Sequence, residues 1–123
     1  MKVEIQIEIE FHGNPYGAGE GKCTLTCNGA TRQQGARAEG VTRNALEIGM
    51  IANACKMLNR PCEVVIYTDN PYIRNCVNNG WLESWNKNGW KRAQGKVLAN
   101  RELWETLYKV LIKHKVRVER RKV

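Results

Sequence analysis

The fold of this chain is decided by a short run near its middle, Glu63-Val64-Val65-Ile66-Tyr67-Thr68-Asp69. The apolar part of this run is unbroken and rich in β-branched residues, which is typical of a strand buried on both faces. Asn70-Pro71 ends the strand, and proline in the first turn of a helix removes no donor that the helix needs. Asp69 is therefore predicted to lie at the carboxyl end of a central strand, where open α/β sheets bind their ligands.

Length and composition indicate one folded domain over residues 1–123. The chain has 123 residues, 42% of them hydrophobic, which is enough for one core and leaves no room for a second. No apolar run approaches the ~20 residues of a membrane helix. The charged start of the chain, residues 1–4, lacks the apolar core of a signal peptide. We therefore expect a cytoplasmic protein with no membrane partner.

The cysteines are odd in number and show no paired spacing: Cys23, Cys27, Cys55, Cys62 and Cys76. Reduced cysteines that pack as small apolar residues are the favoured interpretation. A zinc site would need closer ligand pairs and better placed histidines than His12 and His114.

The positive charge lies in the second part of the chain. Residues 1–79 carry equal numbers of basic and acidic side chains, so residues 80–123 account for the whole net charge of +8. Such asymmetry indicates a face that binds a polyanion. A solvated basic surface without a ligand is the alternative.

Three strands are expected before the first helix. Residues 3–11 alternate between apolar and polar side chains, with Glu8 on the polar side, which predicts a strand. Residues 13–21 are rich in glycine and are predicted to form an irregular connection. Strands are expected at 22–27 and, with a weaker pattern, within 30–38, because Asn28-Gly29 between them is a hairpin signal.

Helices are expected on both sides of the central strand. Thr42 is a predicted N-cap for a helix to about Leu58, whose apolar residues recur every three or four positions. Shorter helices are predicted at 71–77 and 81–87, and a longer one at 101–114 with Asn100 as its cap. A last strand follows at 116–119. The economical arrangement is a mixed five-stranded sheet with helices packed on it.

Three carboxylates are expected to converge if the first strand lies beside the central strand: Glu8, Glu47 and Asp69. Clustered carboxylates repel one another unless a divalent cation neutralises them, so this cluster predicts Mg²⁺ or Mn²⁺. Two such ions would hold a phosphodiester and activate water. Spacing alone leaves the alternatives open that Glu8 is an exposed strand residue and Glu47 an ordinary helix residue.

The sequence resembles type 1 ribonuclease H over residues 3–119, with the matching segments in the same order. These segments are Gly13-Asn14-Pro15, Thr42-Arg43-Asn44-Ala45-Leu46-Glu47, Tyr67-Thr68-Asp69 with Tyr72, Trp81, Trp85, Asn88-Gly89-Trp90-Lys91 and Asn100-Arg101-Glu102-Leu103-Trp104. The resemblance implies a ribonuclease H-like α/β fold, with three antiparallel strands first in a five-stranded mixed sheet flanked by helices. It also implies a metal-dependent endonuclease that cuts the RNA strand of RNA/DNA hybrids.

The resemblance assigns catalytic and metal-binding roles to Glu8, Glu47 and Asp69. Glu8 stands where the family usually has aspartate followed by glycine, and its carboxylate is one methylene longer. The chain stops at Val123, where the family continues into a loop that carries histidine and a final helix that carries the fourth carboxylate. We therefore expect the C-terminal helix to be missing. His114 is interpreted as structural and does not replace that histidine.

The resemblance also implies residues that contact nucleic acid. Asn14 and Asn44 match positions that contact the hybrid backbone and its 2′-hydroxyls, which distinguish RNA from DNA. Pro71 stands where the family often has glutamine, so one substrate contact is expected to be absent. The segment from Trp81 to Trp104 resembles the family's basic protrusion, with the candidate residues Trp81, Trp85, Lys87, Trp90, Lys91, Arg92, Lys96 and Asn100.

Two other functions stay open at this point. A catalytically inactive module that binds RNA/DNA hybrids or other nucleic acid would keep the basic protrusion without a complete carboxylate site. A dimerising fragment would use the apolar face that a missing C-terminal helix would expose, giving a homodimer.

Overall fold

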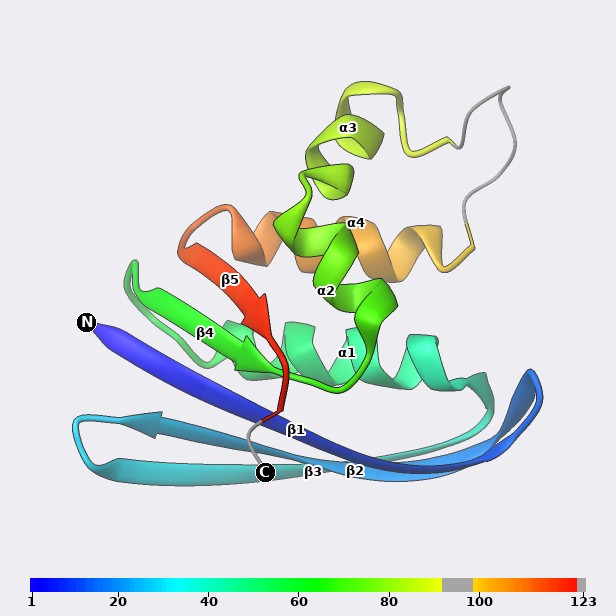
Figure 1. The fold of residues 1–123 in the computed structure, drawn as a ribbon, viewed down its shortest axis with the longest axis horizontal. Helices are drawn as coiled ribbons and strands as arrows, with labels where there is room; N and C mark the ends of the chain where they lie inside the picture. The colour runs from blue at the N-terminus through cyan, green and yellow to red at the C-terminus, as the bar shows by residue number, and fades with distance from the viewer. Residues whose placement is uncertain (92–98, 122–123) are drawn as a thin grey trace.

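The computed structural model describes residues 1–91 and 99–121, and its sheet has the strand order β3-β2-β1-β4-β5 (Figure 1). The strands are β1 (Lys2–Gly13), β2 (Tyr16–Cys27), β3 (Ala30–Thr42), β4 (Glu63–Tyr67) and β5 (Lys115–Glu119). The helices are α1 (Arg43–Lys56), α2 (Pro71–Asn78), α3 (Trp81–Lys87) and α4 (Arg101–Leu111). The predicted mixed five-stranded sheet is confirmed.

Strand β4 is central, as its sequence predicted. It pairs in parallel with β1 on one side and with β5 on the other. Val64 to Tyr67 are all buried, whereas Glu63 at the start of the strand is exposed. Neighbouring strands on both edges and side chains on both faces therefore explain the unbroken apolar run.

The glycine-rich segment is not irregular, which corrects the prediction made for residues 13–21. Strand β2 already begins at Tyr16 and pairs with β1 along this segment. A Cβ on Gly19 would lie 2.6 Å from the Phe11 ring, and a Cβ on Gly21 would lie 2.7 Å from Met50. Glycine is therefore needed here because the partner strand and α1 approach the backbone closely.

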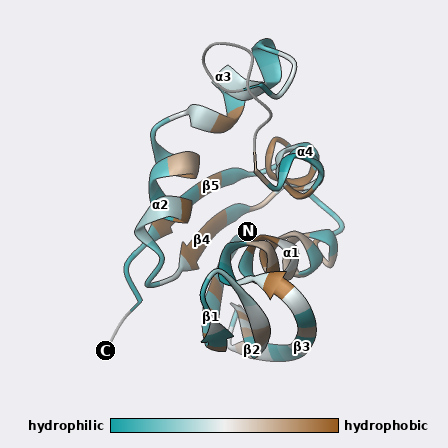
Figure 2. Ribbon diagram, turned by 90° about the vertical axis from the view of Figure 1, so that its right-hand side faces the viewer, coloured by the Kyte–Doolittle hydropathy of each residue, from teal (hydrophilic) through white to brown (hydrophobic). Residues whose placement is uncertain are grey.

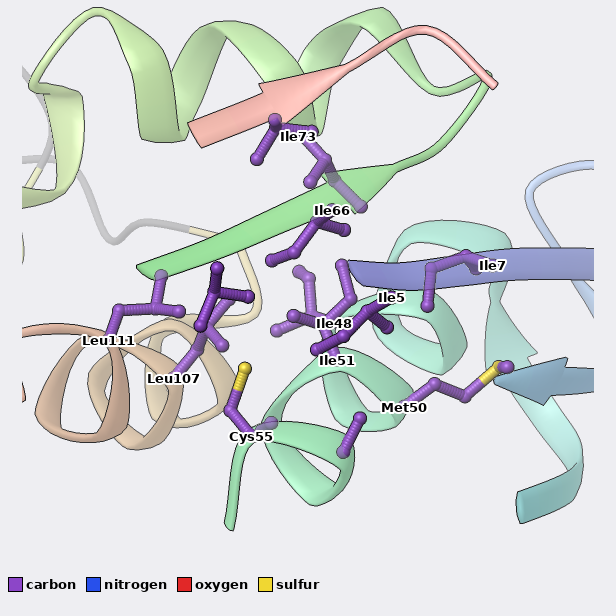
Figure 3. Packing of buried hydrophobic residues seen from close by; sticks show 14 of the residues in the cluster. Ile5, Ile7, Ile48, Met50, Ile51, Cys55, Ile66, Ile73, Leu107 and Leu111 are labelled. Atoms are coloured by element: carbon purple, nitrogen blue, oxygen red, sulfur yellow. The ribbon is translucent and has the colours of Figure 1, made fainter. Parts of the chain in front are cut away.

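All four helices contribute to one apolar core. Helices α1 and α4 pack against each other as a layer beside the sheet, whereas α2 packs along the edge strand β5 (Figure 2). Hydrophobic positions of β4, α1 and α4 gather between these layers (Figure 2). Figure 3 shows the centre of the core, where side chains from β1, α1, β4 and α4 meet: Ile5, Ile7, Ile48, Ile51, Ile66, Leu107 and Leu111.

The strand residues that alternate with the core positions form the other face of the sheet, which is polar. In register across the sheet it carries Glu4, Glu8 and Lys22 together with Arg117 and Glu119. Val65 and Tyr67 lie in the same phase, but both are buried, at 1% and 3% exposure. In the part of the chain that the structure describes, this face is thus not the apolar surface expected from a missing helix, and it lends no support to a homodimer.

Candidate active site at the carboxyl end of β4

Backbone pairing brings the strand of Glu8 beside the strand that precedes Asp69. Gln6 of β1 pairs with Tyr67 of β4 at the end of their register, so Glu8 and Asp69 each lie two residues beyond this pair. The condition set for convergence, that the first strand lies beside the central strand, is met. On the other side of β4, Tyr67 pairs with Glu119, the last residue of β5.

Glu47 reaches this strand end from α1. Its side chain is 1% exposed. Thr68 Oγ1 donates a hydrogen bond to Glu47 Oε1, and Asn70 Nδ2 donates to Glu47 Oε2 at 3.0 Å. Thr68 and Asn70 are the two chain neighbours of Asp69, so α1 is fixed directly to the segment that carries Asp69.

The Asn70 amide fixes the local structure around Asp69. Besides Glu47, its Nδ2 donates to Asn44 Oδ1 at 2.7 Å. Its Oδ1 caps α2 by accepting from the backbone N–H groups of Tyr72 and Ile73. Asp69 itself is exposed, and its carboxylate has no hydrogen bond or ion pair with the described residues. The site therefore presents, among the described residues, an unpaired carboxylate on a fixed backbone.

Glu8 has a different environment, because both of its carboxylate oxygens are paired with cations. Arg121 Nη2 lies 3.1 Å from Oε1, and Lys22 Nζ lies 3.8 Å from Oε2. The Glu8 side chain is 46% exposed. These three side chains lie along a hollow of about 810 Å³ on the polar face, which Arg37 also lines.

The donor set fits a hard divalent cation, but the three carboxylates do not form a ready cage for one. Carboxylate and amide oxygens are the ligands that Mg²⁺ and Mn²⁺ take in proteins, and Glu47, Asp69 and Asn44 supply them. Among the described residues, however, no three His, Cys, Asp or Glu side chains lie close enough to hold one metal ion. Glu47 and Asp69 offer oxygen donors near the carboxyl end of β4. Both oxygens of Glu8 are paired with cations of the protein.

The two predicted asparagines line one hollow. Asn14 and Asn44 contribute to a hollow of about 330 Å³ together with Phe11, Pro15 and Arg43. Asn44 Oδ1 already accepts from Asn70, so the Asn44 side-chain N–H groups are the ones left to face a ligand. The hollow is thus linked to Glu47 through a single amide.

The tryptophans predicted to bind nucleic acid differ in exposure. Trp81 is 40% exposed and lies 6.4 Å, centroid to centroid, from the half-buried Trp85. Trp85 packs in turn on Trp104, with centroids 5.8 Å apart. Trp90 is only 7% exposed and packs edge-on against Tyr108, so its position favours a packing role.

The predicted polar contacts of the same segment are only partly described. Lys87 and Lys91 are exposed and Asn100 is half-buried. Asn100 precedes α4 in a left-handed conformation, with φ 61°, and its side chain makes no capping hydrogen bond, which corrects its predicted role as a cap. Arg92 and Lys96 lie outside the described residues.

Four residues of this site were missed by sequence reasoning. Asn70 was interpreted only as part of a strand stop, although an N-cap residue before Pro71 was a usable signal. Thr68, Lys22 and Arg121 gave no signal, because their partners are set by the sheet register and by the position of α1.

The thiols and His114 have structural environments. All five cysteines are free, and burial raises the pKa of Cys23 and Cys76 to about 11 and that of Cys55 to about 12. His114 Nδ1 accepts a hydrogen bond from the Cys62 backbone N–H at 3.0 Å. Burial lowers the pKa of His114, which suits a neutral ring that acts as acceptor. The structural interpretation of these residues agrees with this geometry.

Within the described ranges, none of the helices is long and apolar enough to cross a membrane. Solved structures of similar shape define the class as ribonuclease H-like. One is the crystal structure of a type 1 RNase H with the type 2 active-site motif, with a TM-score of 0.76, 20% identity, and coverage of 97% of this chain and 63% of that one. Another is the foamy viral protease-reverse transcriptase in complex with RNA/DNA hybrid, with a TM-score of 0.72, 20% identity, and coverage of 97% and 17%. At this identity the likeness shows the fold alone.

Sequence comparison then gives the family. The RNase H family model matches residues 12–122. The chain is 42% identical over 105 residues to the ribonuclease H of Nitratidesulfovibrio vulgaris (strain Miyazaki F), covering 85% of this chain and 67% of that protein. It is 37% identical over 119 residues to the ribonuclease H of Chlorobium chlorochromatii, covering 95% and 81%. This chain belongs to the RNase H family. It spans about two thirds of the length of several relatives.

Proposed function

We propose that this chain is a metal-dependent endonuclease that hydrolyses the RNA strand of RNA/DNA hybrids. The observation that carries the proposal is that Glu47 accepts hydrogen bonds from Thr68 and Asn70, the two chain neighbours of Asp69, in a member of the RNase H family. These bonds fix α1 to the segment that carries Asp69 at the carboxyl end of β4. A site of this kind lies where α/β sheets place their chemistry.

The proposed cofactor is Mg²⁺ or Mn²⁺. The RNase H family works with divalent metal ions, and the oxygen donors of Glu47 and Asp69 suit either ion, with Glu8 as the proposed third ligand. When bound, such an ion would activate a water molecule and stabilise charge on the phosphate. Thr68 and Asn70 hold the Glu47 carboxylate in one orientation, so that little reorganisation is needed for it to bind an ion.

The proposed substrate contacts follow from the two hollows and the basic segment. Asn14 and Asn44 share a hollow with Arg43, a combination that suits a phosphate and a ribose hydroxyl. Trp81 offers an exposed ring on the basic segment that also carries Lys87 and Lys91. Trp85, Trp90, Arg92, Lys96 and Asn100 complete the proposed nucleic-acid-binding set.

A hybrid-binding module without cleavage is the second candidate, and the environment of Glu8 favours it. A carboxylate whose oxygens both face cations of the protein gives little help to a metal ion. The basic segment and the Asn14–Asn44 hollow would still bind nucleic acid in that case.

Cleavage of a hybrid labelled on its RNA strand separates the two candidates. We expect RNA fragments in the presence of Mg²⁺ or Mn²⁺, none with EDTA, and none from Asp69→Asn or Glu47→Gln. Double-stranded DNA of the same sequence serves as the substrate control. Product from wild type no greater than from Asp69→Asn would contradict the enzyme and leave the binding module.

Binding is measured separately, by fluorescence anisotropy of the same hybrid in EDTA. We expect an affinity that falls with salt, as phosphate contacts require. Lys87→Gln with Lys91→Gln should weaken binding, whereas the exposed Lys56→Gln of α1 is the matched control. Salt-independent binding would contradict a polyanion interface.

Location and domain organisation complete the proposal. Five free cysteines, four of them buried, suit a reducing compartment and therefore the predicted cytoplasm. One continuous apolar core formed by strands and helices from both ends of the chain supports a single domain over residues 1–123. The homodimer stays a prediction, which a sedimentation profile would test.

A further inference from the structure

A guanidinium is paired with one of the proposed metal ligands. Arg121 lies two residues beyond the end of β5, and its Nη2 is 3.1 Å from Glu8 Oε1. Lys22 faces Glu8 from the other side as its direct partner in β2.

Resting on the proposed function, we propose that Arg121 and Lys22 compete with the divalent ion for Glu8. A metal ion can use the Glu8 carboxylate only by displacing cations of the protein from it. Glu47 and Asp69 face no such competition, because Glu47 receives only neutral donors and Asp69 has no partner among the described residues. The two halves of the site thus differ in their readiness for a metal ion.

The competition is weak enough for substrate to relieve it. The side chains of Glu8, Arg121 and Lys22 are 46%, 39% and 47% exposed, and exposed ion pairs contribute little to stability. Arg121 lines the open hollow of the polar face, where a phosphate can reach it. A polyanion that draws Arg121 away frees Glu8, so nucleic acid and metal would strengthen each other's binding through this residue.

Mn²⁺ binding without nucleic acid tests the proposal directly, by calorimetry on Arg121→Gln and Lys22→Gln at low salt. Each variant should bind Mn²⁺ more tightly than wild type, by about threefold for Arg121→Gln and less for Lys22→Gln, given the size of exposed ion pairs. The gain should shrink in ~0.5 M NaCl, which screens such pairs. It should vanish in the Glu8→Gln background, because Glu8 is the shared partner.

Arg117→Gln is the matched control. Arg117 lies on β5, four residues before Arg121, but it pairs with Glu119 at 3.0 Å. Removing this charge should leave Mn²⁺ affinity within experimental error of wild type. Equal gains in Arg117→Gln and Arg121→Gln would mean that only net charge matters, and would overturn the proposal.

The experiments distinguish a failure of the proposed competition for Glu8 from a failure of the proposed enzyme function. An Mn²⁺ gain that requires Glu8, with no hybrid cleavage by any variant, supports the competition and refutes the enzyme. Cleavage that depends on Asp69, with unchanged Mn²⁺ affinity in Arg121→Gln and Lys22→Gln, does the reverse. A gain that persists in Glu8→Gln, or no Mn²⁺ binding by any variant, overturns the competition.

Discussion

Asn70 is expected to be a principal stabilising residue, because its amide makes four hydrogen bonds at once. It caps α2 through two backbone N–H groups and donates to both Asn44 and Glu47. Asn70→Ala removes an N-cap, which costs about 0.5–2 kcal/mol, and leaves a buried Glu47 oxygen without its donor, which costs about 1–3 kcal/mol. We expect a loss of about 2–4 kcal/mol from a total of about 5–15 kcal/mol.

Urea unfolding followed by tryptophan fluorescence measures this loss. Asn75→Ala is the control, since Asn75 is an exposed residue of the same helix with no side-chain hydrogen bond among the described residues. Its free energy of unfolding should stay within about 0.5 kcal/mol of wild type. If Asn70→Ala behaves like Asn75→Ala, the reasoning about this amide is refuted.

Asn70→Asp separates the two contributions. Aspartate is as good an N-cap as asparagine, but it donates no hydrogen bond at neutral pH and places a second carboxylate beside Glu47. We therefore expect Asn70→Asp to lose at least as much stability as Asn70→Ala. In the Glu47→Gln background the penalty of Asn70→Asp should become smaller, because the like charge is gone. A free energy of unfolding equal to wild type in Asn70→Asp would show that the contact with Glu47 does not contribute to stability.

Three further predictions concern residues outside the site. Asn78→Ala should cost about 2–3 kcal/mol, because Asn78 pairs with both the N–H and the C=O of Val118; faster hydrogen exchange at the Val118 amide, with Asn79→Ala as control, would verify this. The pKa of His114 is lower in the folded protein than in the unfolded chain, so as pH falls the unfolded chain takes up the proton first. The contribution of neutral His114 to the free energy of unfolding is therefore complete above about pH 6.5 and is lost as pH falls toward the folded pKa. His114→Asn should abolish this part of the pH dependence of unfolding. Iodoacetamide at pH 7.5 should label the partly exposed Cys27 first, since Cys23, Cys55 and Cys76 keep raised pKa values; equally fast labelling of all five cysteines in native protein, detected by mass spectrometry, would contradict their burial.

Elements with a strong period were predictable, and the exceptions have a common cause. The central strand and α1 followed from apolar patterns and from the Thr42 cap, whose side chain accepts from the Ala45 N–H. Residues 13–21 were misjudged because glycine signals a turn when it is considered locally. Gly19 and Gly21 are instead required by the close approach of β1 and α1, which only the folded chain reveals.

The residues of the candidate site also differ in whether the local sequence could predict their positions. Asp69 was predictable, because the end of a buried parallel strand is a property of the local sequence. The partners of Glu8 were not: Arg121 is separated from it by 113 positions, and the two meet only in the folded chain. Residues that hold or neutralise a candidate ligand are thus the least visible from sequence, since any polar residue at the right register position could serve.

The carboxylates of the candidate site differ in how far their negative charge is already compensated. This difference decides where a metal ion should bind first. Glu47 is almost fully buried and receives hydrogen bonds only from neutral donors, Thr68 and Asn70. A buried carboxylate charge is unfavourable unless an opposite charge compensates it, and Asp69, the residue between these two donors, adds negative charge to the same segment. Glu8, in contrast, is half exposed and already compensated by Arg121 and Lys22. A divalent ion therefore gains most at Glu47 and Asp69, and Glu8 can join only after its cations have moved.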